Sequence, residues 1–588
     1  MSNRIAIVDE SKCNPEACGN YLCFRFCPVN RTGKECILKG KKAIIDEELC
    51  TGCNICISKC PFGAIQIVNL PEELKEDPIH RFGQNAFRLF HLPIPKKGEV
   101  VGILGRNGIG KSTALEILSG KIIPNLGDFE NEGSYDKVIE RYSKVALGDY
   151  FRKLKNEEIK VAYKPQRIEL IPKVFSGKVG ELINRIDERD VGEKLIKELG
   201  IEHLRERKLD ELSGGELQKV AIIATAVKDA DFYFFDEPAS FADVTSRVKI
   251  AKLIRGLKEI GAVLVVEHDL ATLDYISDEI QILYGVEGAF GIVSQSKGVR
   301  RGINEYLDGY LPDDNVRFRD YSITFEDKNS DNAVSNEVLI KFPELEKNFE
   351  NFSLKTNSGE VHRGEVLTIM GANGLGKSTF LNLLSGKIKA DNGEVEKYKI
   401  SYKEQNLNSN FEESVRQVLM REAKSDFNSG WYKQNILEKL NLNNVIDNKI
   451  KDLSGGELQK FNVALCLSRD AYIYALDEPS AFVDVEDRLK VAEVIKEFIV
   501  KKEKCAIVID HDVQLVDYLG DRMLVFLGEP AKKGFVEGPF SKRDGMNKVL
   551  EMLDITYRRD NNSHRPRINK PGSNLDSEQR NKKEFYYS

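Results

Sequence analysis

The chain has 588 residues, of which 41% are hydrophobic and 31% charged, and its formal net charge is −6. This length exceeds what one hydrophobic core supports and predicts several domains, while the small net charge excludes a polyelectrolyte contact with nucleic acid over the whole molecule. We find no apolar run long enough to span a membrane and no signal segment behind Met1, so we expect a cytoplasmic protein.

Eight cysteines near the amino terminus form two motifs. Of the 11 cysteines, all but Cys466 and Cys505 lie between Cys13 and Cys60, and without a secretion signal such clustering favours metal ligation over disulfides. The second run has the spacing C-x2-C-x2-C-x3-C-P of bacterial [4Fe–4S] ferredoxins, and the first, C-x4-C-x4-C-x3-C-P, is a looser version. The first run comprises Cys13, Cys18, Cys23 and Cys27, and the second Cys50, Cys53, Cys56 and Cys60.

These motifs predict two [4Fe–4S] clusters in a ferredoxin-like domain. In two-cluster ferredoxins the fourth cysteine of each motif serves the other cluster, which leaves Cys36 without a role. Zinc is the alternative, but the two C-P endings and the number of cysteines favour iron. Because nothing else in the chain resembles a redox site, we favour a structural or mechanical role for the clusters. One cluster would be held by Cys50, Cys53, Cys56 and Cys27, and the other by Cys13, Cys18, Cys23 and Cys60.

A phosphate-binding sequence occurs twice. GRNGIGKST begins at Gly105 and GANGLGKST at Gly371, and both satisfy G-x-x-x-x-G-K-[ST]. Each follows an apolar run and opens a helix-like stretch, the context that a P-loop needs. Its backbone N–H groups surround the phosphates, its lysine reaches the β and γ phosphates, and its serine ligates Mg²⁺. The residues are Gly105, Asn107, Gly108, Gly110, Lys111, Ser112 and Thr113, then Gly371, Asn373, Gly374, Gly376, Lys377, Ser378 and Thr379.

Four further motifs follow each P-loop in the same order: a glutamine, LSGGELQK, an apolar strand ending in Asp-Glu, and a second apolar strand followed by histidine. A lone Asp-Glu pair or histidine is more often a solvated turn or a core residue, but here the whole set recurs. The order resembles the ABC ATPase family. The residues are Gln166, Ser213, Gly214, Gly215, Asp236, Glu237 and His268, then Gln405, Ser454, Gly455, Gly456, Asp477, Glu478 and His511.

The resemblance to ABC ATPases implies a role for each motif. The aspartates would hold Mg²⁺, the glutamines would sense the metal and the γ-phosphate, and the LSGG signatures would act on the opposite P-loop. Asp243 and Asp484 match the loop that links the two sites. No motif residue is substituted in either copy, so the sequence gives no reason to consider either site inactive. The catalytic residues would be Glu237, Glu478, His268 and His511.

Aromatic residues upstream of each P-loop are candidates for stacking on adenine. Phe82 and Phe87 precede the first P-loop, and Phe349 and Phe352 precede the second. The alternative is that they are core residues.

The first copy is longer than the second between its P-loop and Gln166. The surplus lies in residues 131–160, where apolar residues recur at helical spacing and Gly148 could break the helix. We therefore predict an inserted helix–loop–helix; a tolerated surface insertion is the alternative. The apolar residues are Val138, Tyr142, Leu147, Phe151 and Leu154.

The whole chain resembles the class E ABC proteins, also called RNase L inhibitor proteins, which recycle ribosomes. The matches include CPFGAIQIVNLP from Cys60, GVRRGINEYLDGYLP from Gly298 and RRDNNSHRPRINK from Arg558. The resemblance implies a monomeric ATPase that converts ATP to ADP and phosphate, splits ribosomes after termination or stalling, and remains on the small subunit and its rRNA. A release factor or Pelota-type paralogue, and also initiation factors, would be partners. Closure of the ABC domains would move the iron–sulfur domain.

The predicted fold is α/β, with two P-loop ABC domains in tandem and a small α+β iron–sulfur domain. Contacts to rRNA phosphates are expected from the basic residues Arg300, Arg301, Arg317 and Arg319 and from the basic tail 558–588. The alternative is that these are solvated charges of linker segments. The alternative functions are a redox- or iron-sensing ATPase and a transporter subunit.

The predicted boundaries are 1–75 for the iron–sulfur domain, 76–297 and 321–533 for the ABC domains, 298–320 for a first hinge, and 534–588 for a second hinge and tail.

Overall fold

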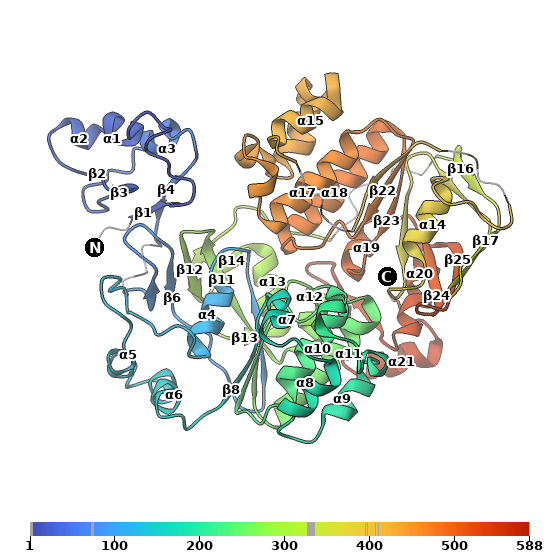
Figure 1. Ribbon diagram of the computed structural model, residues 1–588, viewed down its shortest axis with the longest axis horizontal. Helices are drawn as coiled ribbons and strands as arrows, with labels where there is room; N and C mark the ends of the chain where they lie inside the picture. Colours follow the sequence, from blue (N-terminus) through green and yellow to red (C-terminus); the bar gives the residue numbers. More distant parts are fainter. Residues whose placement is uncertain are drawn as a thin grey trace.

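The computed structural model describes residues 4–586, except 72, 73, 75, 326–334, 394, 395, 397, 406, 408 and 410. It contains a small amino-terminal domain, two larger domains that are each built on an extended sheet, and shorter elements between and after them (Figure 1). This agrees with the predicted fold class. None of the described helices is long and apolar enough to cross a membrane.

The amino-terminal domain repeats one small unit. Helix α1 carries Cys23 and ends at Cys27, and α3 carries Cys56 and ends at Cys60. The two helices pack together, and their cysteines share a core with the isoleucines of the strands. The elements are β1 (Arg4–Val8), α1 (Leu22–Phe26), α2 (Pro28–Arg31), β2 (Ile37–Lys39), β3 (Ala43–Ile45), α3 (Ile55–Lys59) and β4 (Ile65–Asn69), with β1 antiparallel to β4 and β2 to β3.

This domain is fixed to the first ABC domain by a buried amide. Asn85 donates from Nδ2 to the carbonyl oxygens of Ala6 (3.1 Å) and Ile45 (2.9 Å), and its Oδ1 accepts from the Ile45 N–H (2.8 Å). Arg88 pairs with Glu47 beside it. Because a buried amide that loses its partners costs free energy, these bonds fix the orientation of the domain. Figure 1 shows it (dark blue) at one end of the first ABC domain.

The first ABC domain is a sheet with strand order β5-β6-β12-β11-β7-β10-β9-β8, and β13 pairs with β11. Strands β11, β7, β10, β9 and β8 are mutually parallel. Strands β7 and β10 are buried along their whole length, as expected for parallel strands covered on both faces. The strands are β5 (His80–Arg81), β6 (Arg88–Phe90), β7 (Val100–Leu104), β8 (Val161–Lys164), β9 (Phe232–Asp236), β10 (Ala262–Val266), β11 (Glu279–Val286), β12 (Phe290–Val293) and β13 (Lys297–Gly298).

The helices of this domain begin at the predicted motifs. The P-loop opens α4, and Ser213 of the signature caps α10 by accepting from the Glu216 N–H. The helices are α4 (Lys111–Leu118), α5 (Tyr135–Arg141), α6 (Ala146–Lys155), α7 (Ile171–Val174), α8 (Val179–Ile186), α9 (Gly192–Glu198), α10 (Gly214–Ala226), α11 (Val244–Gly256) and α12 (Leu270–Ile276).

The insertion contains the two helices α5 and α6, which pack on each other. The predicted break at Gly148 was wrong, because Gly148 lies inside α6 and the chain turns before Ala146. A Cβ at Gly148 would lie 2.3 Å from the Tyr142 carbonyl oxygen. Glycine is therefore required there for the close approach of the end of α5 to α6.

The second ABC domain repeats this arrangement with the strand order β17-β18-β25-β24-β20-β23-β22-β21, while β16 pairs with β19. The strands are β16 (Val338–Phe342), β17 (Leu345–Asn348), β18 (Ser353–Thr356), β19 (Gly359–His362), β20 (Val366–Met370), β21 (Ile400–Lys403), β22 (Ile473–Asp477), β23 (Cys505–Ile509), β24 (Arg522–Glu529) and β25 (Lys533–Ser541). The helices are α14 (Lys377–Leu384), α15 (Val415–Ala423), α16 (Gly430–Tyr432), α17 (Gly455–Ser468), α18 (Val485–Lys502), α19 (Val513–Leu519) and α20 (Lys542–Met552).

The predicted boundary after residue 533 was wrong. Strand β25 begins at Lys533 and pairs with both β18 and β24 in the second sheet. Helix α20 then packs on β24 and β25. The second ABC domain therefore extends through α20, since the hydrogen bonds of β25 belong to its sheet.

The chain between and after the ABC domains is ordered by internal ion pairs. Asp274 of α12 binds the buried Arg567 (Nε–Oδ2 2.8 Å) and Arg565 (Nη1–Oδ2 3.2 Å) of the carboxyl-terminal segment. Asp560 binds Arg300 of α13 at 2.9 Å. The elements are α13 (Val299–Asp308), β14 (Tyr310–Leu311), β15 (Val316–Arg317), β26 (Tyr557–Arg559), β27 (Pro566–Ile568) and α21 (Asn574–Lys582).

Three of the arginines that were predicted to contact phosphate form contacts within the protein, but the side chains of Arg300 and Arg301 stay about half exposed. Besides Arg300, Arg301 pairs with Asp313 at 2.7 Å, and the buried Arg319 donates to the Tyr306 carbonyl oxygen at 2.6 Å. Arg317 remains exposed. Arg319 is buried, and a buried guanidinium group must be paired. Contact of Arg300, Arg301 and Arg317 with phosphate stays a prediction.

We expect Asp274→Asn to destabilise the protein by about 3–5 kcal/mol, because it leaves the buried Arg565 without its carboxylate partner and Arg567 with Asp560 alone. The measurement is the shift of the urea unfolding curve. Asp554→Asn is the control: this exposed carboxylate also pairs with an arginine, Arg580, but its loss should cost less than about 1 kcal/mol. An equally small effect of both variants would contradict the prediction.

Candidate nucleotide sites and cysteine centres

The first ABC sheet brings its motifs to one edge. Strands β8, β9, β10 and β7 are consecutive parallel neighbours, so their carboxyl ends meet on the same side of the sheet. Gln166 follows β8, Asp236 ends β9, His268 follows β10, and the P-loop follows β7. Ligands bind at this edge of open α/β sheets. In the second domain, β21, β22, β23 and β20 place Gln405, Asp477, His511 and the second P-loop in the same way.

Each P-loop turns into its helix through a glycine with positive φ. Gly110 has φ +94° and Gly376 has φ +91°, a backbone conformation that other residues rarely adopt. The following lysines are buried: Lys111 Nζ donates to the Gly105 carbonyl oxygen at 3.0 Å, and Lys377 Nζ to the Gly371 carbonyl oxygen at 2.7 Å. Burial lowers the pKa of Lys377 to about 8. A phosphate group at this position would stabilise the ammonium form.

The two Asp-Glu pairs have matching geometry. Glu237 and Glu478 both have φ +49°, and such positive φ values in non-glycine residues are characteristic of functional sites. Gln166 Nε2 donates to Glu237 Oε1 at 2.7 Å, and Gln405 Nε2 donates to Glu478 Oε1 at 2.7 Å. The histidine Nε2 atoms lie 3.6 Å (His268) and 3.5 Å (His511) from the same carboxylate oxygens.

Burial sets the protonation of these groups. Burial and then the neighbouring Glu237 raise the pKa of Asp236 to about 6, and burial and then Asp510 raise the pKa of Glu478 to about 7. Burial lowers the pKa of His268 and His511 well below the usual range of histidine. The histidines are therefore neutral near pH 7 and can offer one N–H donor each.

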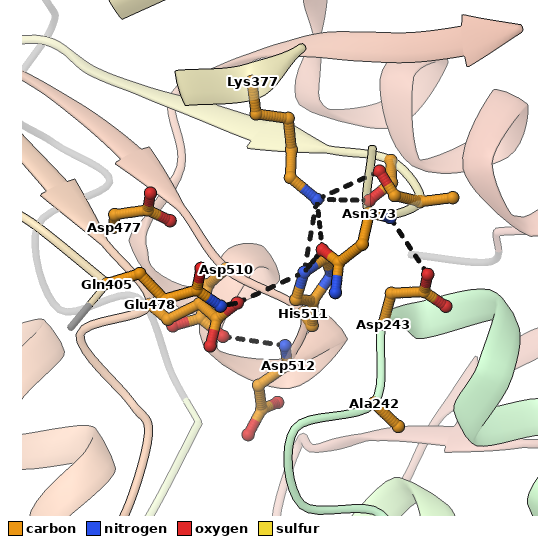
Figure 2. A network of polar contacts seen from close by, with 12 residues as sticks. Ala242, Asp243, Asn373, Lys377, Gln405, Asp477, Glu478, Asp510, His511 and Asp512 are labelled. Atoms are coloured by element: carbon orange, nitrogen blue, oxygen red, sulfur yellow. Dashed lines mark hydrogen bonds and ion pairs between the residues drawn. The ribbon is translucent and has the colours of Figure 1, made fainter. Parts of the chain in front are cut away.

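The two ABC domains contact each other at both P-loops. Asp243 of the first domain accepts from the Asn373 N–H at 2.9 Å, and Asp484 of the second accepts from the Asn107 N–H at 3.4 Å. Figure 2 shows Asp243 reaching toward Asn373, beside Lys377 and His511. Between the sites, the rings of Phe241 and Phe482 lie edge to face, 5.5 Å apart. The expected link between the two sites is therefore present in both directions.

A single cavity of about 2110 Å³ includes both sites. It exceeds the roughly 300–1,000 Å³ of a typical ligand pocket, so it has room for more than one nucleotide. Glu287 lies beside Gly108 of the first P-loop, and burial raises its pKa. Glu457 of the second signature lines the same cavity. The lining includes both P-loops, Gln166, Gln405, Glu237, Glu478, His268, His511 and both signatures, 213–215 and 454–456.

The aromatic candidates differ in position. Phe82 is 53% exposed and lines the cavity, whereas Phe349 is 44% exposed and lies outside the cavity lining. Phe87 and Phe352 instead pack against the P-loops, since a Cβ on Gly110 would lie 2.7 Å from Phe87 and one on Gly376 would lie 2.8 Å from Phe352. Phe87 and Phe352 also line the cavity. Phe82 is therefore accessible to a base at the first site, and Phe352 is the candidate that lines the cavity at the second.

The cysteines surround two small cavities in the amino-terminal domain. Within the described residues, no three Cys, His, Asp or Glu side chains converge on a single metal ion. A ring of thiols around a cavity is what an iron–sulfur cluster requires, because the cluster separates its four ligands. The Ala64 N–H also donates to Cys60 Sγ at 3.4 Å. One cavity is lined by Cys13, Cys18, Cys23 and Cys60, and the other by Cys27, Cys50, Cys53, Cys56 and Cys36.

Burial makes several of these thiols weak acids in the absence of iron. It raises the pKa of Cys23 to about 11 and that of Cys56 to about 12. Iron would displace these protons, because the thiolate is the metal ligand. Cys36 is buried and its Sγ lies 3.8 Å from the Asp46 carbonyl oxygen.

Comparisons with known proteins match the whole chain. The model of the ABC transporter family matches residues 94–240 and 354–481, a possible Fer4-like domain of RNase L inhibitor matches 3–35, and the 4Fe-4S binding domain matches 43–66. ABC transporter E family member 1 of Arabidopsis thaliana is 42% identical over 595 residues, which cover 99% of this chain and 98% of the relative. The chain belongs to the ABC class E, or RNase L inhibitor, family. This confirms the predicted family and its ATPase activity.

Two solved structures resemble this class E protein closely. A model of ribosome-bound archaeal Pelota and ABCE1 has a TM-score of 0.93 at 49% identity and covers 100% of this chain and 99% of its own. A complex of archaeal ribosomal stalk protein aP1 with the archaeal ribosome recycling factor aABCE1 has a TM-score of 0.84 at 47% identity, covering 88% of this chain and 100% of its own. Both confirm the fold over nearly the full length.

The class E chain also contains a repeated pair of site residues that we did not predict. Tyr163 and Tyr402 donate to Oδ2 of Asp236 (3.5 Å) and Asp477 (3.2 Å). The following lysines, Lys164 and Lys403, are buried, and each donates to the carbonyl oxygen of the same aspartate at 2.7 and 2.6 Å. The signal was present, because Tyr-Lys precedes the glutamine motif in both copies.

The signature motif extends further than its glycines. Gln218 and Gln459, within LSGGELQK, are buried and donate from Nε2 to the carbonyl oxygens of Glu237 (2.7 Å) and Glu478 (2.6 Å). In each domain this bond ties the signature helix to the glutamate of the same domain.

Proposed function

We propose that this chain is an ATP-driven ribosome recycling factor that splits ribosomes into subunits after termination or stalling and then remains on the small subunit. The reciprocal contacts of Asp243 and Asp484 with the opposite P-loops carry the proposal. ATP bound between the two domains would add its phosphates to these contacts and close the molecule, and hydrolysis would release it. The relatives named for Pelota, ribosome binding and recycling support the ribosome as the target.

Each nucleotide site would use residues of both domains. The P-loop N–H groups and Lys111 or Lys377 would hold the phosphates, and the opposite signature, 454–456 or 213–215, would donate to the γ-phosphate. Mg²⁺, when bound, neutralises phosphate charge. Its ligands would be Ser112 with Gln166 and Ser378 with Gln405, supported through its water shell by Asp236 and Asp477; Ser378 Oγ already lies 3.4 Å from Asp477 Oδ2.

In hydrolysis, a water would attack the γ-phosphorus, and the bond to the bridging oxygen would break with its electron pair leaving on ADP. Glu237 or Glu478 would orient this water and accept its proton, while His268 or His511 would donate to the γ-phosphate. The proton would finally leave with inorganic phosphate. This assignment rests on the glutamine hydrogen bonds of 2.7 Å to both carboxylates and on the position of each histidine 3.5–3.6 Å from the same carboxylate.

The amino-terminal domain would hold two [4Fe–4S] clusters. Their ligands are proposed to be Cys13, Cys18, Cys23 and Cys60 for one, and Cys27, Cys50, Cys53 and Cys56 for the other, as the two cavities suggest. The position of this domain on the first ABC domain, held by Asn85, supports a mechanical role, because closure of the ABC domains would move it as one body.

Phe82 would stack on the adenine ring at the first site, where it is exposed at the cavity. We expect Phe82→Ala to weaken ATP binding at the first site by about 5- to 100-fold, because one stacked base contributes about 1–3 kcal/mol. Equilibrium titration with a fluorescent ATP analogue measures the effect, and Phe82→Tyr should restore binding. Equal weakening by both substitutions would show that Phe82 acts by packing.

ATP-dependent splitting of purified ribosomes tests the proposed function. In the presence of ATP, the full chain with a release factor or Pelota-type partner should split intact ribosomes into subunits. It should then sediment with the small subunit. Failure to split with either partner would refute the proposal. A rate of ATP hydrolysis that follows reduction of the clusters under anaerobic titration, without splitting, would instead support a redox-sensing ATPase.

Initiation factors are further candidate partners on the small subunit.

A further inference from the structure

The two candidate catalytic carboxylates differ in one hydrogen-bond donor. Ser240 Oγ donates to Glu237 Oε2 at 3.1 Å, while Gln166 occupies the other oxygen. The equivalent position in the second copy, three residues after Glu478, is Ala481, which has no hydroxyl. Within the described residues, the Glu237 carboxylate is thus held at both oxygens by side-chain donors, and no hydroxyl group donates to Glu478.

The second copy has its hydroxyl one residue earlier and uses it elsewhere. Ser480 Oγ donates to Asp510 Oδ1 at 2.8 Å. In the first copy the corresponding residues are Ala239 and Glu267, and the Ala239 N–H donates to Glu267 Oε2 at 3.0 Å. The Ser480 N–H makes the same contact with Asp510 Oδ2 at 3.1 Å, so the hydroxyl bond is the additional one. The first copy has Ala239-Ser240 and the second has Ser480-Ala481. The serine hydroxyl therefore contacts Glu237 in the first copy and Asp510 in the second.

The hydroxyl of Ser240 is not needed to form the local turn. The Ser240 N–H donates to the Glu237 carbonyl oxygen at 3.4 Å, and the Ala481 N–H donates to the Glu478 carbonyl oxygen at 3.3 Å. The following phenylalanines also share a left-handed conformation, with φ +60° at Phe241 and +64° at Phe482. The same backbone thus forms with serine or alanine, which leaves the carboxylate as the target of the hydroxyl.

We propose that Ser240 positions the Glu237 carboxylate for the attacking water, a contact that the second site lacks because Ala481 stands at the equivalent position. A carboxylate anchored at both oxygens loses less rotational freedom on the way to the transition state than one anchored at a single oxygen. The inference rests on the catalytic role proposed for Glu237 and Glu478.

Single-turnover ATP hydrolysis on the full chain tests this proposal, with the other site silenced by Glu478→Gln or Glu237→Gln. At the first site, Ser240→Ala should lower the rate about three- to ten-fold, the effect of one hydrogen bond, without changing the affinity for ATP. Ser240→Thr, which keeps the hydroxyl, should retain the rate. At the second site, Ala481→Ser should raise the rate by a similar factor.

Two results would overturn the positioning role. One is an equal loss of rate in Ser240→Ala and Ser240→Thr, which would indicate packing. The other is an unchanged first-site rate in Ser240→Ala. If the chain retains full first-site turnover when Glu237 itself is changed to Gln, the catalytic assignment fails, and the role of Ser240 fails with it.

Discussion

ATP turnover should fall by about 100- to 10,000-fold when Glu237 and Glu478 are both changed to Gln, because each site loses the group that accepts the proton of the attacking water. ATP binding should remain, since Gln has the same shape and the P-loop lysines are unchanged. The closed form should then persist, and the variant should stay on the small subunit in the presence of ATP. Phosphate release and co-sedimentation with purified small subunits measure the two effects.

The matched control for this double variant is Glu198→Gln, an exposed glutamate at the end of α9 that pairs with Lys194. It should leave both turnover and subunit release unchanged. A double variant that hydrolyses ATP at the normal rate would refute the catalytic assignment. One that is inactive but dissociates from small subunits with ATP would refute the proposal that ATP closure retains the factor there.

The iron content of two variants should distinguish the proposed cluster ligand Cys53 from its neighbour Cys36, which is not a proposed ligand. Cys53→Ser should lower the iron and sulfide content per chain to about half, because one of two clusters loses a ligand, and ribosome splitting should be lost while ATP binding remains. Cys36→Ala should keep the full iron content. Chemical iron and sulfide analysis of the anaerobically purified chain, with its visible absorption spectrum, measures this.

The difference in burial between Cys53 and Cys36 allows these two variants to distinguish metal ligation from packing. Cys53 is exposed, whereas Cys36 is 2% exposed. If the thiols mattered through packing, changing Cys36 would be the more harmful substitution; if they matter through ligation, changing Cys53 would be. Loss of iron in the Cys36 variant, or stoichiometric zinc in place of iron, would contradict the ligand set that we propose.

The sequence by itself determined the domain types and the motifs at each site. P-loop, signature, Asp-Glu and histidine motifs each depend on local backbone chemistry: a glycine that permits positive φ, a serine that caps a helix, or an apolar strand that ends at the sheet edge. Such features are encoded within a few residues, and the duplication of the motif set made their order decisive. For the same reason, Gly148 was misinterpreted, because its role depends on the approach of a second helix.

The tertiary structure decided what joins distant parts of the chain. The pairing of Asp274 with Arg567 and the contact of Asp243 with Asn373 connect residues far apart in sequence, and β25 belongs to the second ABC sheet because it pairs with β18 and β24. The target of the Ser240 hydroxyl likewise follows from side-chain geometry. Local sequence patterns do not predict such contacts, because they depend on which side chains are buried together and complement each other in the folded chain.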